Sequence, residues 1–214
     1  MAYVLTYNNL VNLLTTYLER TDASLVDYIP TFILLAQVRI GREIKQLGTR
    51  QVVNSTFSGG TSVIAKPNDW RETININYGT GTSSNTRNNL LPRSYEYCRD
   101  YWPDPTQTTS NVEFYADYNY EHWLICPTPD SSYPVEVMYY ATPKPIDITT
   151  QTNWLTQYAP DLLLYACLLE SAPFLKVDER IQVWTGLYDR ALAAINGEAQ
   201  ARVEDGATSR EGDK

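Results

Sequence analysis

The chain of 214 residues carries a formal net charge of −8, with 25 acidic residues against 17 basic ones. A chain of this length can bury a sizeable core in one domain or in two small domains. Its acidity argues against a nucleic-acid-binding protein that works by neutralising phosphates.

The N-terminal segment predicts a helix that follows Thr6, which can serve as the N-cap. Its apolar residues recur at helical spacing and are Leu10, Leu13, Leu14, Tyr17 and Leu18. The segment lacks the basic flank and the small-residue cleavage site of a signal peptide. We therefore expect a cytosolic protein.

A second helix is expected between Pro30, which suits the first helical turn because it has no N–H to leave unpaired, and Gly48, a typical stop. Its apolar face also contains Arg39 and Glu43. Because a charge buried alone is costly, we expect Arg39 to approach a polar partner inside a helical bundle. The candidate partner is Glu170, which follows an apolar run in a later helix.

From Gln51 to about Ile146 the periodicity becomes that of short strands. The segments "TININY", "VEFYADY", "HWLICP" and "PVEVMYY" are separated by turn clusters such as "SGG" and "TPDSS". We expect an antiparallel β domain.

One connection in this region, "GTGTSSNTRNN" from Gly79 to Asn89, is small and polar and looks too long for a tight turn. We expect a mobile hairpin tip that contacts a neighbouring subunit or a tail protein. The candidate contact residues are Thr80, Asn85 and Arg87.

Helical periodicity resumes at Asn153, which can cap a short turn. Pro160 then begins the main helix, with Asp161 in its first turn, where a carboxylate favours the helix dipole. Pro173 is expected to end this helix. Its apolar run is far shorter than the roughly 20 residues that a membrane span needs.

The last helix is expected to begin at Asp178 as N-cap. It carries an apolar stripe of Ile181, Trp184, Leu187, Tyr188, Ala191, Leu192 and Ile195. After Gly197 the sequence "EAQARVEDGATSREGDK" is polar and has no stripe, so it predicts a tail that orders only against a partner.

These elements predict an α+β fold: a helical bundle formed by the N- and C-terminal helices, an inserted antiparallel β domain and an extended C-terminal tail. The expected divisions are 1–50 and 147–197 for the two halves of the bundle, 51–146 for the β domain and 198–214 for the tail. The apolar helix from Leu162 to Leu169 should be the central member of the bundle. A bundle this small leaves helix faces exposed, which points to a second subunit.

The sequence gives little support for catalysis, and no enzyme activity, cofactor or metal is expected. It has no GxSxG, P-loop, dinucleotide-binding or HExxH motif. Its single histidine, His122, lies four residues before Cys126, and with Cys98 and Cys167 the three cysteines form no usual zinc pattern.

Two sugar-related alternatives remain open from the residues. Paired carboxylates for glycoside hydrolysis could come from Asp100, Asp104, Glu113, Asp117 and Glu121. A non-catalytic carbohydrate-binding β-sandwich module is the alternative function, with the aromatic residues of "SYEYCRDYW" as the sugar platform. The terminal helices argue against that module, because it needs no bundle built from both chain ends.

The segments "IPTFILLAQVRIGREIK", "VEFYADYNYEHWLICPTPDSSYPVEVMYY" and "TNWLTQYAPDLLLYACLLESAPFLKVDERIQVWTGLYDRAL" closely resemble, in this order, the head-to-tail adaptor proteins of short-tailed bacteriophages. The resemblance runs from about Tyr7 to Ile195 and is most specific from Asn153 to Leu192. The Gly79 to Asn89 loop and "RSYEYCRDYWPDPTQ" depart from it.

The resemblance implies a structural virion protein, assembled in the host cytoplasm and located in the neck. Such adaptors form a homo-oligomeric ring, typically of twelve copies, beneath the capsid portal and provide the platform for a tail or nozzle protein. Double-stranded DNA would pass through the lumen without specific binding. The C-terminal segment would reach the portal protein, with Arg202, Val203, Glu204, Asp205 and Arg210 as candidate portal-binding residues.

Overall fold

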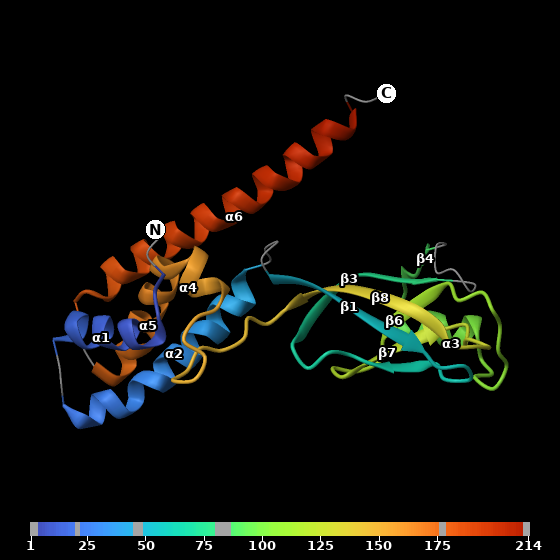
Figure 1. Ribbon diagram of the computed structural model, residues 1–214, viewed down its shortest axis with the longest axis horizontal. Coiled ribbons are helices and arrows are strands. Elements are labelled where there is room, and N and C mark those ends of the chain that lie inside the picture. The colour runs from blue at the N-terminus through green and yellow to red at the C-terminus, as the bar shows by residue number, and fades with distance from the viewer. Residues whose placement is uncertain (1–3, 20–21, 45–48, 80–86, 176–178, 212–214) are drawn as a thin grey trace. The chain divides into compact units, whose positions relative to one another are not determined.

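The computed structural model describes residues 4–19, 22–44, 49–79, 87–175 and 179–211, without the side chains of residues 199–211 (Figure 1). The chain divides into two compact units, residues 1–49 with 142–214 and residues 50–141. The first unit contains helices α1 (Tyr7–Leu18), α2 (Ala23–Glu43), α4 (Trp154–Tyr158), α5 (Pro160–Leu175) and α6 (Ile181–Glu211). The second contains helix α3 (Tyr95–Tyr101) and strands β1 (Arg50–Phe57), β2 (Val63–Ala65), β3 (Trp70–Gly79), β4 (Arg87–Asn89), β5 (Leu91–Pro92), β6 (Phe114–Asp117), β7 (His122–Cys126) and β8 (Tyr133–Ala141). The predicted α+β class with an inserted β domain is confirmed.

Helix α5 is the central helix of its unit and contacts α1, α2, α4 and α6 (Figure 1). Its sequence is apolar on every side, and its fully buried residues include Leu162, Leu163, Ala166, Cys167 and Leu168. The surrounding helices are amphipathic and turn their apolar stripes toward it. The predicted central position of the Leu162 to Leu169 run is therefore confirmed.

Two predicted helix caps form as expected because each depends only on residues within one turn. The Thr6 hydroxyl accepts a hydrogen bond from the N–H of Asn9 at 3.2 Å, at the start of α1. Asn153 caps α4: its Oδ1 accepts from the N–H of Thr156 at 3.1 Å, and the Thr156 hydroxyl accepts from the N–H of Asn153 at 2.9 Å. This reciprocal pair is a capping box.

Of the three proline-based boundaries, the start of the main helix at Pro160 is confirmed, and the other two were wrong. Helix α2 begins at Ala23 with Asp22 as N-cap, and Pro30 lies inside it. Helix α5 runs past Pro173 to Leu175. An internal proline removes one helix hydrogen bond, but continuing each helix buries apolar side chains that a break would expose. In α2 these include Leu25, fully buried before the proline, and in α5 the ring of Phe174 packs on those of Tyr28 and Phe32.

The C-terminal boundary also differs from the prediction. The backbone of α6 stays helical to Glu211, so the expected extended tail after Gly197 is a continuation of the helix. Glutamate, alanine, glutamine and arginine are good helix formers, and a glycine inside a helix costs only about 1 kcal/mol. The predicted stop at Gly48 and N-cap at Asp178 lie outside the described residues.

The β unit is a sandwich of two four-stranded sheets. The first sheet has the strand order β1-β8-β3-β4 and the second the order β2-β7-β6-β5. Their facing sides form one core, to which Phe57, Tyr78 and Val137 contribute from the first sheet and Trp123 and Ile125 from the second. The pairing is antiparallel as predicted, except that β5 runs parallel to β6.

The second sheet is covered on both faces. Its outer face packs on helix α3 through a smaller core of Cys98, Phe114, Ala116, Leu124 and Cys126. This explains why β6 and β7 contain runs of consecutive buried residues instead of an alternating pattern. The helix α3 itself was missed from the sequence, where "SYEYCRDYW" was interpreted as an aromatic platform.

Candidate functional site

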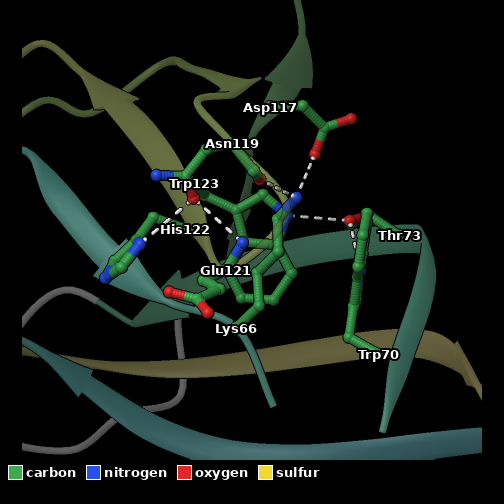
Figure 2. A network of polar contacts seen from close by, with 8 residues as sticks. All are labelled: Lys66, Trp70, Thr73, Asp117, Asn119, Glu121, His122 and Trp123. Atoms are coloured by element: carbon green, nitrogen blue, oxygen red, sulfur yellow. Dashed lines mark hydrogen bonds and ion pairs between the residues drawn. The ribbon is translucent and has the colours of Figure 1, made fainter. Parts of the chain in front are cut away.

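A buried network of polar contacts in the β unit surrounds Lys66, which follows β2 (Figure 2). Its side chain is 1% exposed, and its Nζ donates to Asp117 Oδ1 at 2.8 Å and to the carbonyl oxygen of Asn119 at 2.9 Å. The ammonium also lies 3.5 Å from the ring centroid of Trp70, a close cation–π contact. Lys66 thereby ties β2 to the turn that joins β6 and β7.

The surroundings of Lys66 hold both tryptophan rings in place. The hydroxyl of Thr73 in β3 accepts from the indole N–H of Trp123 at 2.9 Å and from that of Trp70 at 3.1 Å. Figure 2 shows Lys66 between these groups and the turn. An ammonium has three N–H donors, and here two oxygens and one aromatic face occupy them. The site therefore stabilises the sandwich and leaves no donor for a substrate.

The structure brings Arg39 and Glu170 together in the helical unit. Arg39 Nε lies 3.1 Å from Glu170 Oε1, but the two side chains are 40% and 21% exposed. The expected approach occurs, whereas the expected burial does not. A groove of about 590 Å³ between α2, α5 and α6 admits solvent along Arg39. Long charged side chains commonly lie along apolar surface with their charged ends in water.

Glu43, the other charged residue on the expected apolar face of α2, also has a partner. Its carboxylate accepts from the hydroxyl of Tyr188 in α6. Burial, together with this hydrogen bond and the negative charge of Glu43, raises the pKa of Tyr188 well above the usual tyrosine value. The guanidinium carbon of Arg39 lies 5.9 Å from the centroid of the Tyr188 ring, and its positive charge partly lowers the pKa of Tyr188. The charged residues of α2 therefore join it to α5 and α6.

Of the three expected neighbour-contact residues, Arg87 is described and Thr80 and Asn85 lie outside the described residues. Arg87 is in β4, where its Nη1 donates to Asn77 Oδ1 at 3.0 Å and its Nη2 lies 3.5 Å from Glu136 Oε2. This network crosses the outer face of the first sheet. Side chains of the same sheet thus orient the guanidinium of Arg87, although the Arg87 side chain remains 45% exposed.

The expected portal-binding residues Arg202, Val203, Glu204, Asp205 and Arg210 all lie on the last turns of α6, where only the backbone is described. The structure places them on a helix instead of on an extended segment. Their side-chain contacts lie outside the described part of the chain.

The catalytic alternatives gain no support from the described residues. His122 Nδ1 lies 3.1 Å from Asn119 Oδ1, while Cys126 Sγ is 3.3 Å from the carbonyl oxygen of Cys98, so His122 and Cys126 each have another partner. Burial raises the pKa of Cys126 to about 12, which keeps its thiol protonated. No group of three or more His, Cys, Asp or Glu suited to a metal occurs in the described ranges.

The five carboxylates considered for glycoside hydrolysis have ordinary structural roles where contacts are described. Asp104 accepts hydrogen bonds from the hydroxyl and N–H of Thr106, which lower its pKa. A glycosidase acid needs the opposite shift. Glu113 accepts from Asn111 and Tyr101, and Asp117 pairs with Lys66. None of these contacts creates a general acid.

The tyrosines of α3 form a half-exposed aromatic surface on the second sheet. Tyr97 and Tyr101 stack with their ring centroids 6.0 Å apart, and both contact Phe114 edge-on. The guanidinium of Arg93 lies 5.5 Å from the ring of Tyr97. The rings that the sugar-binding alternative requires are therefore already in contact with one another and with Arg93. Tyrosine and arginine side by side are typical of protein–protein interfaces.

Helix α2 is, by length and composition alone, apolar enough to cross a membrane. Its buried face, which includes Ile29, Ile33 and Ile40, packs in the bundle core. Core helices of water-soluble proteins pass the same test. Its opposite side exposes Leu34 and Leu35 by 48% and 45%, and Tyr28 is 52% exposed although its ring packs on Phe174 of α5.

Comparison with known proteins gives one family. A family model described as SU10 adaptor protein matches residues 5–210, nearly the whole chain. No curated protein matches the chain.

Proposed function

Because the chain belongs to the SU10 adaptor protein family, a family of phage head-to-tail adaptors, we propose that it forms a homo-oligomeric ring beneath the capsid portal. The ring is proposed to contain twelve copies and to serve as the platform for a tail or nozzle protein in the virion neck. Subunits are made and assembled in the host cytoplasm. The family match over both structural units is the observation that carries this proposal.

The outer face of α2 supports contact between neighbouring subunits. Tyr28, Leu34 and Leu35 leave large apolar side chains in water in the single chain. In a closed ring each bundle packs beside the next, so this surface is removed from water in every copy. Burial between neighbouring subunits would therefore explain the exposed apolar side chains of α2, just as burial inside the bundle explains the apolar sequence of α5.

The C-terminal part of α6 is proposed to contact the portal protein. Residues 198–211 continue a helix whose earlier turns hold the bundle through Trp184 and Tyr188. A helix anchored at one end presents the other end with little loss of backbone entropy on binding, unlike an extended tail. Arg202 and Arg210 are proposed to meet carboxylates of the portal, with Val203 as an apolar contact.

The acidity of the chain suits passage of double-stranded DNA through the ring. Each subunit has a formal net charge of −8. A lumen with fixed negative charge repels phosphates, so DNA passes without specific binding. The role is structural, with no catalytic step and no cofactor.

Electron microscopy of the purified protein, alone and mixed with portal rings, tests the proposal. Rings of the single protein, or rings seated on the portal, are the expected result. A monomer that binds no portal at any ratio would reject the ring and the platform. A chain that ends at Gly197 should keep the bundle but fail to co-sediment with portal. Equal co-sedimentation of both chains would move the portal contact away from α6.

A further inference from the structure

Strand β1 is an unprotected edge of the first sheet. It pairs with β8 without a register shift from Arg50–Tyr140 to Phe57–Tyr133, and it pairs with no other described strand. Natural edge strands usually carry a lysine, a proline or a bulge that prevents further pairing. From Gln51 to Phe57 the sequence "QVVNSTF" has no charge and no proline. The outer N–H and C=O groups of β1 can therefore pair with another strand.

A cavity of about 230 Å³ lies between the two sheets next to this edge. Its apolar walls come from both sheets and include Val53, Phe57, Ile64, Ile76, Trp123 and Val137. Ser55 of β1 and Ala65 of β2 also line it, and both are exposed. The cavity therefore opens between the two edge strands. Lys66 lines it as well, but its ammonium is bound to Asp117 and to the carbonyl oxygen of Asn119. Apolar cavities of about 150 Å³ already accept a benzene ring, so this one has room for a leucine, isoleucine or phenylalanine side chain.

The free edge and the cavity are linked by the pleat of the sheet. Side chains alternate along a strand, so Val53, Ser55 and Phe57 face the cavity while Asn54 faces the other side. A strand added beside β1 continues this alternation and points every second side chain toward the cavity mouth. We propose that β1 binds an extended segment of a partner protein by strand addition, with one large apolar side chain of that segment filling the cavity.

The chemistry of the edge defines the segment. Because β1 is uncharged after Arg50, it offers no ion-pair partner to a charged side chain of the segment at those positions. Arg50 donates through Nη2 to the hydroxyl of Tyr140 at 3.4 Å, whereas its buried Nε has no hydrogen-bond partner among the described residues. The positive charge favours an acidic residue at the end of the segment that lies beside Arg50.

The occupant is a segment of a different protein and not of a second copy. The most exposed large apolar side chains of the described chain, Tyr120, Ile148, Tyr158 and Val183, lie on helices or bends, where the backbone cannot continue a sheet. Two others lie on strands: Val52 belongs to β1 itself and points away from the cavity, and Leu91 belongs to β5, which is only two residues long. This inference concerns the β unit alone, so its failure would leave the proposed ring untouched.

The test uses the full chain and a synthetic peptide of seven residues, alternating threonine and valine with leucine at the centre. Hydrogen exchange of the β1 amides is measured with and without peptide. We expect protection of β1 and binding about tenfold or more tighter than for the same peptide with aspartate at the centre, because the leucine side chain leaves water. Ser55→Lys should abolish binding by placing a charge at the cavity mouth, while Asn54→Lys on the opposite face should retain it.

Each other outcome contradicts the proposal. Unchanged β1 exchange at millimolar peptide would reject strand addition, and equal binding of the leucine and aspartate peptides would reject insertion into the cavity. Peptide-free dimers that Ser55→Lys disrupts would assign the edge to a second copy. If Ser55→Lys fails to fold, Ser55→Leu replaces it: its own side chain should fill the cavity, raise the melting temperature and weaken peptide binding. Unweakened binding to Ser55→Leu would count against the proposal.

Discussion

The side-chain oxygen of Gln37 in α2 accepts a hydrogen bond from the backbone N–H of Ile146 at 2.9 Å. Gln37 is 3% exposed, and the same oxygen also accepts from Asn153 Nδ2 at 3.1 Å. Its amide nitrogen donates to the carbonyl oxygen of Ile33 at 3.2 Å. One buried amide therefore joins the first half of the bundle to the segment that leads into α4.

We predict that Gln37→Leu destabilises the helical unit by about 1–3 kcal/mol. The leucine fills a similar volume but leaves the N–H of Ile146 without its acceptor, and the Asn153 amide keeps only the carbonyl oxygen of Lys144. Thermal unfolding followed by circular dichroism measures the change. Gln157→Leu, at an exposed position of α4, is the matched control and should melt like the parent. Equal melting of both variants would show that the Gln37 contacts contribute nothing.

We predict that Lys66→Met destabilises the β unit by about 2 kcal/mol. Methionine keeps most of the packing of the lysine stem but removes the cation–π contact with Trp70 and the donor to Asp117. The fluorescence of the tryptophans at the site reports unfolding in denaturant. Lys144→Met, at an exposed position, is the control and should leave the midpoint unchanged. A Lys66→Met midpoint equal to that of the parent would contradict a stabilising role.

We predict that Glu170→Gln lowers stability by less than about 1 kcal/mol. Removing one partner of a fully buried ion pair costs roughly 3 to 5 kcal/mol, but Arg39 is 40% exposed and solvent screens its interaction with Glu170. Melting curves at low and high salt provide the measurement. A large loss that salt does not change would restore the buried interpretation.

We predict that stability falls between pH 10 and pH 12 because of Tyr139. Its hydroxyl donates to Asp69 Oδ1 at 2.9 Å, and burial followed by this hydrogen bond raises its pKa from 10 to about 12. The folded state thus keeps a proton that the unfolded state loses, so its stabilising effect is complete below pH 10 and disappears as pH rises through 12. Tyr139→Phe should flatten this part of the stability curve. Denaturant midpoints of the parent and of this variant across the pH range provide the measurement, and equal curves would contradict the prediction.

We predict that Leu35→Glu prevents ring formation while the subunit still folds. The side chain is 45% exposed on α2, so a carboxylate is tolerated in the single chain but is desolvated at the proposed subunit contact. Light scattering and electron microscopy measure assembly, and circular dichroism measures folding. Asn12→Glu, an equally charged change at an exposed site on α1, should still form rings. Intact rings of Leu35→Glu would exclude this face of α2 from the contact.

The features determined by the sequence alone depend on residues close together in the chain. The caps at Thr6 and Asn153 are hydrogen bonds across three residues, and the stripe of α6 follows from helical spacing. The apolar content of the Leu162 to Leu169 run required a central position, because no side of that helix can face water. The resemblance to phage head-to-tail adaptors is confirmed by the family match.

Only the tertiary structure determines the features that depend on residues far apart in the chain. Pro30 and Pro173 stay inside helices because burial of neighbouring side chains offsets a lost backbone hydrogen bond. The pairing of Lys66 with Asp117 joins residues 51 positions apart, and no local pattern indicates it. The cavity beside β1 forms only when the two sheets pack together, because residues from five strands line it. Local periodicity specifies which face of an element is apolar, but only the assembled fold determines which surface covers that face.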